Sequence, residues 1–139
     1  MTQETFGFIG LGLIGGSLAK ALKRSNPSCR IMAYSRTSTT TGLALSEHAI
    51  DICCTSVSDP QFAACDCIFL CAPVDTNISA LRILKDIVPP DCILTDVGSV
   101  KTDIHRAAQE MGLNGRFIGG HPMTGSEKSG FAHAQAHLF

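Results

Sequence analysis

The chain has 139 residues, 45% hydrophobic and 17% charged, which is typical of one globular domain. A domain of this size buries roughly two thirds of the surface of its unfolded chain, so it needs no disulfide or metal for stability. The 11 basic and 12 acidic residues give a net charge of -1 without any run of like charge, which argues against a nucleic-acid or membrane partner. The N-terminus lacks the pattern of a signal peptide and no apolar run approaches the ~20 residues that span a bilayer, so we expect a cytoplasmic protein.

Short apolar runs alternate with longer stretches of helical period, the pattern of a parallel sheet covered by helices. Six strands are predicted, near residues 5–9, 29–34, 52–54, 66–71, 92–95 and 116–118. The connections are short and show no internal repeat. The sequence therefore predicts a single α/β domain with a mainly parallel sheet.

Helical spacing is clearest after the first strand, where Ile14, Leu18 and Leu22 share one face and Asn26-Pro27 stops the helix. Residues 37–46 are a weaker candidate because their threonines are β-branched. Two more helices and the start of a third are predicted: one capped by Asp75 and ended by Pro89-Pro90, one opened by Ser99 or Val100 and closed by Gly112, and one beginning after Gly130.

A glycine-rich turn follows the first strand and opens the first helix. It reads Gly10-Leu11-Gly12-Leu13-Ile14-Gly15-Gly16-Ser17. In a dinucleotide-binding turn the first glycine makes a tight bend, the second admits the pyrophosphate and the third packs helix on strand. Free amides at the helix start then meet the phosphates. Because the strand, the spacing and the helix all agree, we predict cofactor binding here rather than a structural turn.

The choice of cofactor is expected at the end of the second strand, where an acidic residue holds the free ribose 2′-hydroxyl of NAD. The segment Tyr34-Ser35-Arg36-Thr37 has no acid and offers a guanidinium and hydroxyls that suit a 2′-phosphate. The sequence therefore favours NADP over NAD. The alternative is that Arg36 stacks on the adenine and accepts either cofactor.

Three further segments follow the ends of later strands. Cys71-Ala72-Pro73 has small residues that let a cofactor lie close, although plain packing explains it equally well. The other two are 95–101, TDVGSVK, and 119–130, GGHPMTGSEKSG. Since the carboxyl ends of parallel strands meet at one edge, Ser99 and His121 are predicted to lie near the nicotinamide.

In this order and spacing, the strings GLGLIGGSLA, TDVGSVK and FIGGHPMTGSEKSG resemble the prephenate and arogenate dehydrogenase family across almost the whole chain. The resemblance implies a Rossmann-type, doubly wound fold. It also implies an NAD(P)-dependent oxidation of a ring hydroxyl, coupled to loss of carbon dioxide, in tyrosine biosynthesis. His121 would accept the proton of the ring hydroxyl, and Ser99 would hydrogen-bond to that histidine and to the hydroxyl.

The chemistry agrees with these roles, because a histidine with an ordinary pKa near ~6.5 can take a proton at neutral pH. In a purely structural reading, His121 only caps a turn before Pro122. Ser126 and Glu127 correspond by the resemblance to the substrate entrance, where Ser126 would bind a carboxylate and Glu127 would act as a gate. Lys101 and Lys128 are candidates to attract the anion, although such lysines are more often only solvated.

Histidine and cysteine patterns give no metal signal. His133 and His137 are four residues apart, but the glutamate of H-E-x-x-H is replaced by Ala134. His48 and His105 are expected to be surface residues without partners. The seven cysteines include no C-x-x-C pair and are expected to be small, reduced, buried side chains.

The similar enzymes continue into a helical domain that forms a homodimer and supplies an arginine to the substrate, so this chain is expected to be truncated before it. A cleft closed on one side only is therefore expected to bind cofactor better than substrate. Prephenate is the principal substrate hypothesis and arogenate its alternative. A β-hydroxyacid dehydrogenase would need a catalytic lysine on a later helix, and a non-catalytic dinucleotide-binding module would not need His121.

Overall fold

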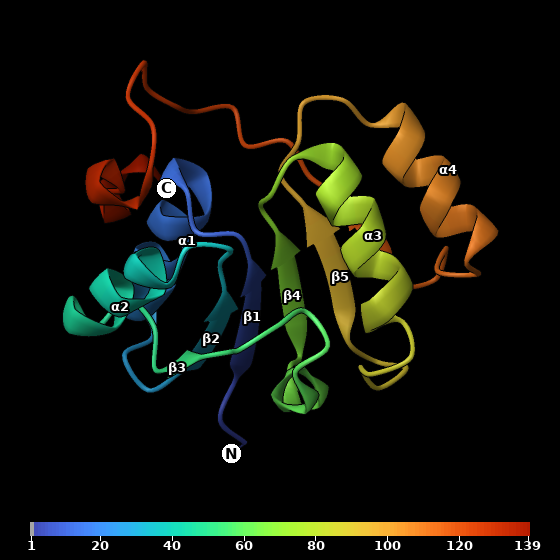
Figure 1. Cartoon of the computed structure of the whole chain (residues 1–139), viewed down its shortest axis with the longest axis horizontal. Helices are drawn as coiled ribbons and strands as arrows, with labels where there is room; N and C mark the ends of the chain where they lie inside the picture. Colours follow the sequence, from blue (N-terminus) through green and yellow to red (C-terminus); the bar gives the residue numbers. More distant parts are fainter. Residues whose placement is uncertain (1) are drawn as a thin grey trace.

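A six-stranded, fully parallel sheet forms the centre of the protein in a computed structural model that describes residues 2–139 (Figure 1). The strands are β1 (Thr5–Ile9), β2 (Arg30–Tyr34), β3 (Ile52–Cys53), β4 (Cys67–Leu70), β5 (Ile93–Asp96) and β6 (Phe117–Gly119). All six predicted strands are confirmed, with ends that differ by at most one residue.

The spatial order of the strands is β3-β2-β1-β4-β5-β6. The chain runs outward in one direction to β3 and then crosses back to place β4 beside β1. This is the strand order of a doubly wound dinucleotide-binding fold, in which ligands bind where the order reverses. The predicted Rossmann-type architecture is therefore confirmed, with the reversal between β1 and β4.

Four α-helices cover the two faces of the sheet: α1 (Leu13–Ser25), α2 (Ser38–Ser46), α3 (Val74–Leu84) and α4 (Thr102–Glu110). Neighbouring residues of each strand face opposite sides. In β1, Phe8 joins a core with Ala19 of α1 and Ala44 of α2. Ile9 joins a second core with Leu81 of α3 and Ile104 of α4. The sheet is thus buried on both faces, as parallel sheets require.

Three short 3-10 helices complete the fold: η1 (Pro60–Ala64), η2 (Phe131–His133) and η3 (Ala136–Leu138). The helix expected after Gly130 is wrong, because this segment forms two single turns interrupted at Ala134 and Gln135. Tertiary contacts with α1 compete there with the helical pattern. Figure 1 shows that these turns lie beside α1, although more than 100 residues of sequence separate them from it.

Two predicted helix starts also differ from the structure. Asp75 is not the cap of α3, since Pro73 occupies that position and Asp75 lies in the first turn. A proline there suits a helix start because it has no N–H to leave unpaired. The fourth helix begins at Thr102 rather than at Ser99 or Val100, because residues 97–101 form an irregular loop that packs around Asp96.

The cysteines pack as apolar side chains. All seven are free thiols; Cys29, Cys54, Cys65 and Cys92 are buried in the cores, and the other three are half-buried. Burial raises the pKa of the Cys67 thiol to about 11 and that of Cys54 to about 12. No helix within residues 2–139 has the length and apolar character needed to cross a membrane.

Candidate cofactor and substrate site

The carboxyl ends of the strands lie at one level. The pairing registers align Tyr34 with Ile9, Ile9 with Leu70, Leu70 with Asp96, and Asp96 with Gly119. Each sequence motif contains one of these residues or follows it directly. The ladder therefore brings the glycine turn, the Arg36 segment, the Cys71 segment and the two later loops to the same edge of the sheet.

The glycine turn has the geometry expected of a phosphate-binding turn. Gly10 has a φ of +90°, a conformation that side chains rarely adopt, and its N–H donates to the carbonyl of Tyr34 (2.8 Å). A Cβ on Gly15 would lie 2.8 Å from the oxygen of Gly10 and 3.0 Å from Cβ of Cys71. A Cβ on Gly12, in contrast, would meet nothing within 4 Å. Gly15 thus packs the helix on the strands, and Gly12 leaves space for a ligand.

The N-terminus of α1 is open to an anion. Its cap residue is Gly12, no side chain caps the first turn, and the first turn contains no acidic residue. The first N–H groups of the helix therefore have no carboxylate competing with a ligand. Together with the helix dipole, they form a ready site for a phosphate.

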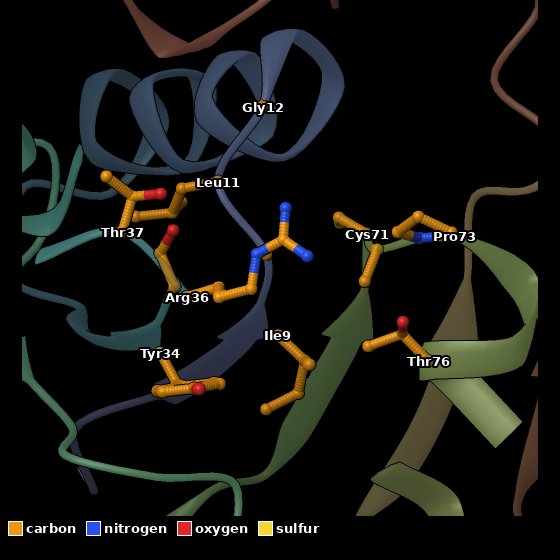
Figure 2. Close-up of a pocket in the computed structure, with 12 residues that line it drawn as sticks. Ile9, Leu11, Gly12, Tyr34, Arg36, Thr37, Cys71, Pro73 and Thr76 are labelled. Atoms are coloured by element: carbon orange, nitrogen blue, oxygen red, sulfur yellow. The ribbon is translucent and has the colours of Figure 1, made fainter. Parts of the chain in front are cut away.

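A cleft of about 270 Å³ lies between the glycine turn, the end of β2 and the end of β4. Its lining includes predicted cofactor residues from three segments: Gly10, Gly12, Ser35, Arg36, Thr37, Cys71, Ala72 and Pro73. Leu13, Ile14 and Gly15 belong to the adjoining helix start. Figure 2 shows the guanidinium of Arg36 extending toward the opening between Leu11 and Cys71. Arg36 is exposed, and no carboxylate within residues 2–139 pairs with it.

The turn after β4 is held by Asn77, a residue that the sequence analysis missed. Asn77 is 1% exposed; its amide oxygen accepts from the N–H of Ala72 (3.1 Å) and its amide nitrogen donates to the carbonyls of Ala72 (2.9 Å) and Leu70 (3.3 Å). It replaces the backbone partners that the turn lacks. An asparagine in the first turn of a helix that follows a strand was the available signal.

Asp96 is the second residue that the sequence analysis missed. Its buried carboxylate accepts from Lys101 Nζ (2.5 Å), from the N–H of Gly98 (3.3 Å) and from the N–H of Gly120 (3.2 Å). Asp96 therefore joins the loop after β5 to the loop after β6. Lys101 is committed to this ion pair, so its role is structural in this arrangement.

The candidate catalytic and substrate residues lie on these two loops. Ser99 is exposed in the loop after β5, and His121 is exposed next to the anchored Gly120. Within residues 2–139 their side chains form no hydrogen bond with each other. Ser126 and Glu127 are exposed further along, where Ser126 Oγ accepts from the N–H of Lys128 (3.1 Å). The fold thus brings both loops to the same edge of the sheet as the glycine turn, and the Ser99–His121 contact stays a prediction.

The remaining candidates differ in how the fold uses them. Burial raises the pKa of the Cys71 thiol well above its usual range, so this cleft residue is a neutral packing group. His105 has a partner after all: its ring packs edge-on against Phe117, with 5.5 Å between ring centroids. His133 and His137 lie in the two C-terminal turns, and residues 2–139 contain no cluster of three potential metal ligands.

Comparison with known proteins assigns this arrangement to a family. Residues 18–139 match the family described as "Prephenate dehydrogenase, nucleotide-binding domain". The chain is 37% identical over 134 residues to the prephenate dehydrogenase of Lactococcus lactis subsp. cremoris (strain MG1363), an alignment that covers 94% of this chain and 37% of that protein.

Solved structures of similar fold support the same family assignment. The prephenate dehydrogenase of A. aeolicus in complex with hydroxyphenyl propionate and NAD+ superimposes with a TM-score of 0.90 at 32% identity, covering 100% of this chain and 48% of that one. The Synechocystis arogenate dehydrogenase gives a TM-score of 0.86 at 36% identity, covering 97% and 46%. The chain spans less than half the length of each of these three relatives.

The family match covers most of the chain, and the structural matches extend over the glycine turn that precedes residue 18. The fold, the open helix N-terminus and the cleft at the strand reversal are what such a domain requires. The chain belongs to the prephenate dehydrogenase family, a family of dehydrogenases, and matches its nucleotide-binding domain.

Proposed function

We propose that this chain is the cofactor domain of an NADP-dependent dehydrogenase that oxidatively decarboxylates prephenate to 4-hydroxyphenylpyruvate, with arogenate as the alternative substrate. The observation that carries the proposal is the single edge that unites the glycine turn with the loops bearing Ser99 and His121. The family match supports the reaction class.

The cleft fits a nicotinamide dinucleotide. Gly12 leaves the space that a pyrophosphate needs beside the first N–H groups of α1, and the β4 turn supplies small residues opposite. When bound, the cofactor would accept a hydride from the substrate. The residues of the chain would hold the phosphates at Gly10, Gly12, Leu13, Ile14 and Gly15, and the other side of the cofactor at Cys71, Ala72 and Pro73.

The preference for NADP rests on the end of β2. Ser35, Arg36 and Thr37 line the cleft where an NAD enzyme places a carboxylate, and a guanidinium binds a phosphate through two parallel hydrogen bonds. The A. aeolicus relative is bound to NAD+, so the comparison does not support a preference for NADP. It follows from the residues of this chain.

For the chemical step, we assign the proton to His121. Its imidazole would accept the proton of the ring hydroxyl as the hydride leaves the same carbon, and Ser99 would orient both groups. Loss of carbon dioxide then leaves an aromatic ring, which makes the step downhill. Ser126 would bind a substrate carboxylate and Glu127 would orient or gate the substrate, since a carboxylate repels a dianion.

The cofactor part is tested by fluorescence titration of this chain with NADPH and then with NADH. We expect NADPH to bind at least about tenfold more tightly, which corresponds to about 1.4 kcal/mol. Equal affinities would overturn the NADP assignment but not the dinucleotide site. Failure of both cofactors to bind would contradict the proposed site as a whole.

The reaction is tested in a protein of the relatives' length that contains this domain, with prephenate and arogenate supplied in turn. His121→Asn should retain NADPH affinity and lose reduction of NADP+. Turnover unchanged by this substitution would contradict the assignment of the base. A non-catalytic dinucleotide-binding module would bind cofactor and show no His121-dependent reaction. A helical second domain, a homodimer and a cytoplasmic location remain predictions for such a protein.

A further inference from the structure

The last residues of the chain pack on the helix that opens the cofactor site. We call residues 120–130 the site loop and residues 131–139 the C-terminal segment. A Cβ on Gly16 of α1 would lie 2.5 Å from Phe131 Cδ2 and 2.8 Å from Cβ of Ala134. Phe131 and Ala134 are almost fully buried. Only a glycine at position 16 lets the C-terminal segment approach α1 this closely.

Polar contacts hold the same segment. The side chain of Ser17 is completely buried, and its Oγ accepts from the N–H of Gln135 (2.9 Å). Lys20 Nζ donates to the carbonyl of Ala134 (3.0 Å) and lies 4.8 Å from the centre of the Phe131 ring. Hydrogen bonds and a cation over an aromatic face both require a defined geometry, so this docking has one specific register.

The site loop is therefore attached at both ends. Its first residue, Gly120, is bound to Asp96 below the edge of the sheet, and Phe131 follows directly after its last residue. Figure 1 shows the loop running along the carboxyl-end edge from the β6 side to the C-terminal segment beside α1. His121, Ser126 and Glu127 lie between the two attachments.

We infer that Gly16, Ser17 and Lys20 are positioning residues, which hold the far end of the site loop so that His121 stays near the cofactor. This inference rests on the proposed function. Gly16 stands next to the three glycines of the cofactor turn, but its contacts are with Phe131 and Ala134. One helix thus serves both partners of the reaction: its N-terminus faces the cofactor and its next residues hold the loop.

The physical reason is restricted freedom. A loop fixed at both ends samples far fewer positions than one fixed at a single end, and the group it carries has a higher effective concentration at its target. The restriction needs no contact between Gly16 and His121.

The test compares two phenylalanines of the C-terminal segment in the chain itself. Phe131→Ala removes the side chain against Gly16, whereas Phe139→Ala, the matched control, removes a half-exposed ring near Leu18 and Leu22. The imidazole NMR signals of His121 are recorded during titration with NADPH. Ser17→Ala is a milder second variant, because it removes only one hydrogen bond. It serves as the test if Phe131→Ala does not fold.

We expect all variants to bind NADPH with affinities within about twofold of the parent protein, a difference of about 0.4 kcal/mol. The NADPH-induced shift of the His121 signals should fall to less than half in Phe131→Ala, fall less in Ser17→Ala, and stay unchanged in Phe139→Ala. A merely structural role would leave this shift intact in every variant that binds cofactor.

Two results would overturn the inference. One is a His121 shift in Phe131→Ala equal to that of the parent protein at equal NADPH affinity. The other result concerns the case in which no protein binds NADPH, so that the proposed function fails by itself. The anchoring is then contradicted if the backbone order parameters of residues 121–130 do not fall in Phe131→Ala.

Discussion

The carboxylate of Asp96 accepts a hydrogen bond from the N–H of Gly120, which lies 24 residues further along the chain (3.2 Å). The same carboxylate pairs with Lys101 at 2.5 Å. One buried acid thus sets the relative positions of the loop with Ser99 and the loop with His121. The Asp96–Lys101 ion pair and the hydrogen bond to Gly120 therefore connect the two loops of the candidate active site.

Lys101→Met is expected to lower the free energy of unfolding by about 3 kcal/mol, because it leaves the buried Asp96 carboxylate without its counter-charge. Lys128→Met is the matched control: this lysine is exposed, so its loss should change stability by less than about 0.5 kcal/mol. Urea denaturation measures both. Equal losses of unfolding free energy in the two variants would show that the Asp96–Lys101 ion pair does not stabilise the fold.

The glycine turn allows a stability effect to be separated from a binding effect. Gly12→Ala should fold with a loss below about 1 kcal/mol, since its Cβ meets nothing in the protein, but should abolish NADPH binding by occupying the pyrophosphate space. Gly15→Ala should lose about 2 kcal/mol or more, because its Cβ meets the backbone oxygen of Gly10. Thermal unfolding and NADPH titration of each variant check this division, and a Gly12→Ala protein that binds NADPH normally would refute it.

Arg36→Gln should weaken NADPH binding about tenfold, or about 1.4 kcal/mol, and leave NADH binding within about twofold. The guanidinium is exposed at the cleft, so its replacement should not alter the stability of the fold. Arg24→Gln, on the same domain but outside this cleft, is the charge-matched control for long-range attraction. Were Arg36→Gln to weaken both cofactors alike, stacking on the adenine would be the better account.

Asn77→Asp should destabilise the protein by about 2 kcal/mol, since it removes the donors to the carbonyls of Leu70 and Ala72 and puts a carboxylate beside them. NADPH affinity should fall as well, because the turn that Asn77 holds lines the cleft. Asn114→Asp, an exposed change of the same kind, should alter neither property. Chemical denaturation and the NADPH titration together provide the check.

Asp59 makes one part of the stability dependent on pH. Its carboxylate accepts from the N–H groups of Gln61 and Thr55, both at 3.0 Å, and these hydrogen bonds hold the pKa of Asp59 below its usual value. A lowered folded-state pKa adds stability above the unfolded value near ~3.9, and that stability is lost as the pH falls through the folded value. Asp59→Ala should therefore cost about 1 kcal/mol at neutral pH.

The difference between the parent protein and Asp59→Ala should shrink as the pH is lowered below about 4. Urea denaturation at a series of pH values measures it. Asp91→Ala, an exposed aspartate, is the control and should show no such difference. A constant deficit at every pH would mean that Asp59 acts through packing rather than through its charge.

The sequence by itself determined the features that rest on local periodicity and on single-residue conformational rules. Six apolar runs separated by helical stretches indicated the parallel sheet, and the spacing of Gly10, Gly12 and Gly15 indicated the tight, closely packed turn between β1 and α1. The residues that make each of these signals lie close together in the sequence. The absence of an acid after β2 belongs to the same class, and so does the direct connection of each motif to a strand end.

Only the tertiary structure decided how distant segments restrain one another. In the sequence, Asp96 looks like an ordinary strand end, because the N–H of Gly120 that it binds becomes its neighbour only when the sheet forms. The C-terminal segment has a helical pattern, yet docking of Phe131 on Gly16 and of Gln135 on Ser17 outweighs it. Local propensity amounts to a few tenths of a kcal/mol per residue, whereas burying an aromatic ring contributes about 2 kcal/mol, so the long-range contact prevails.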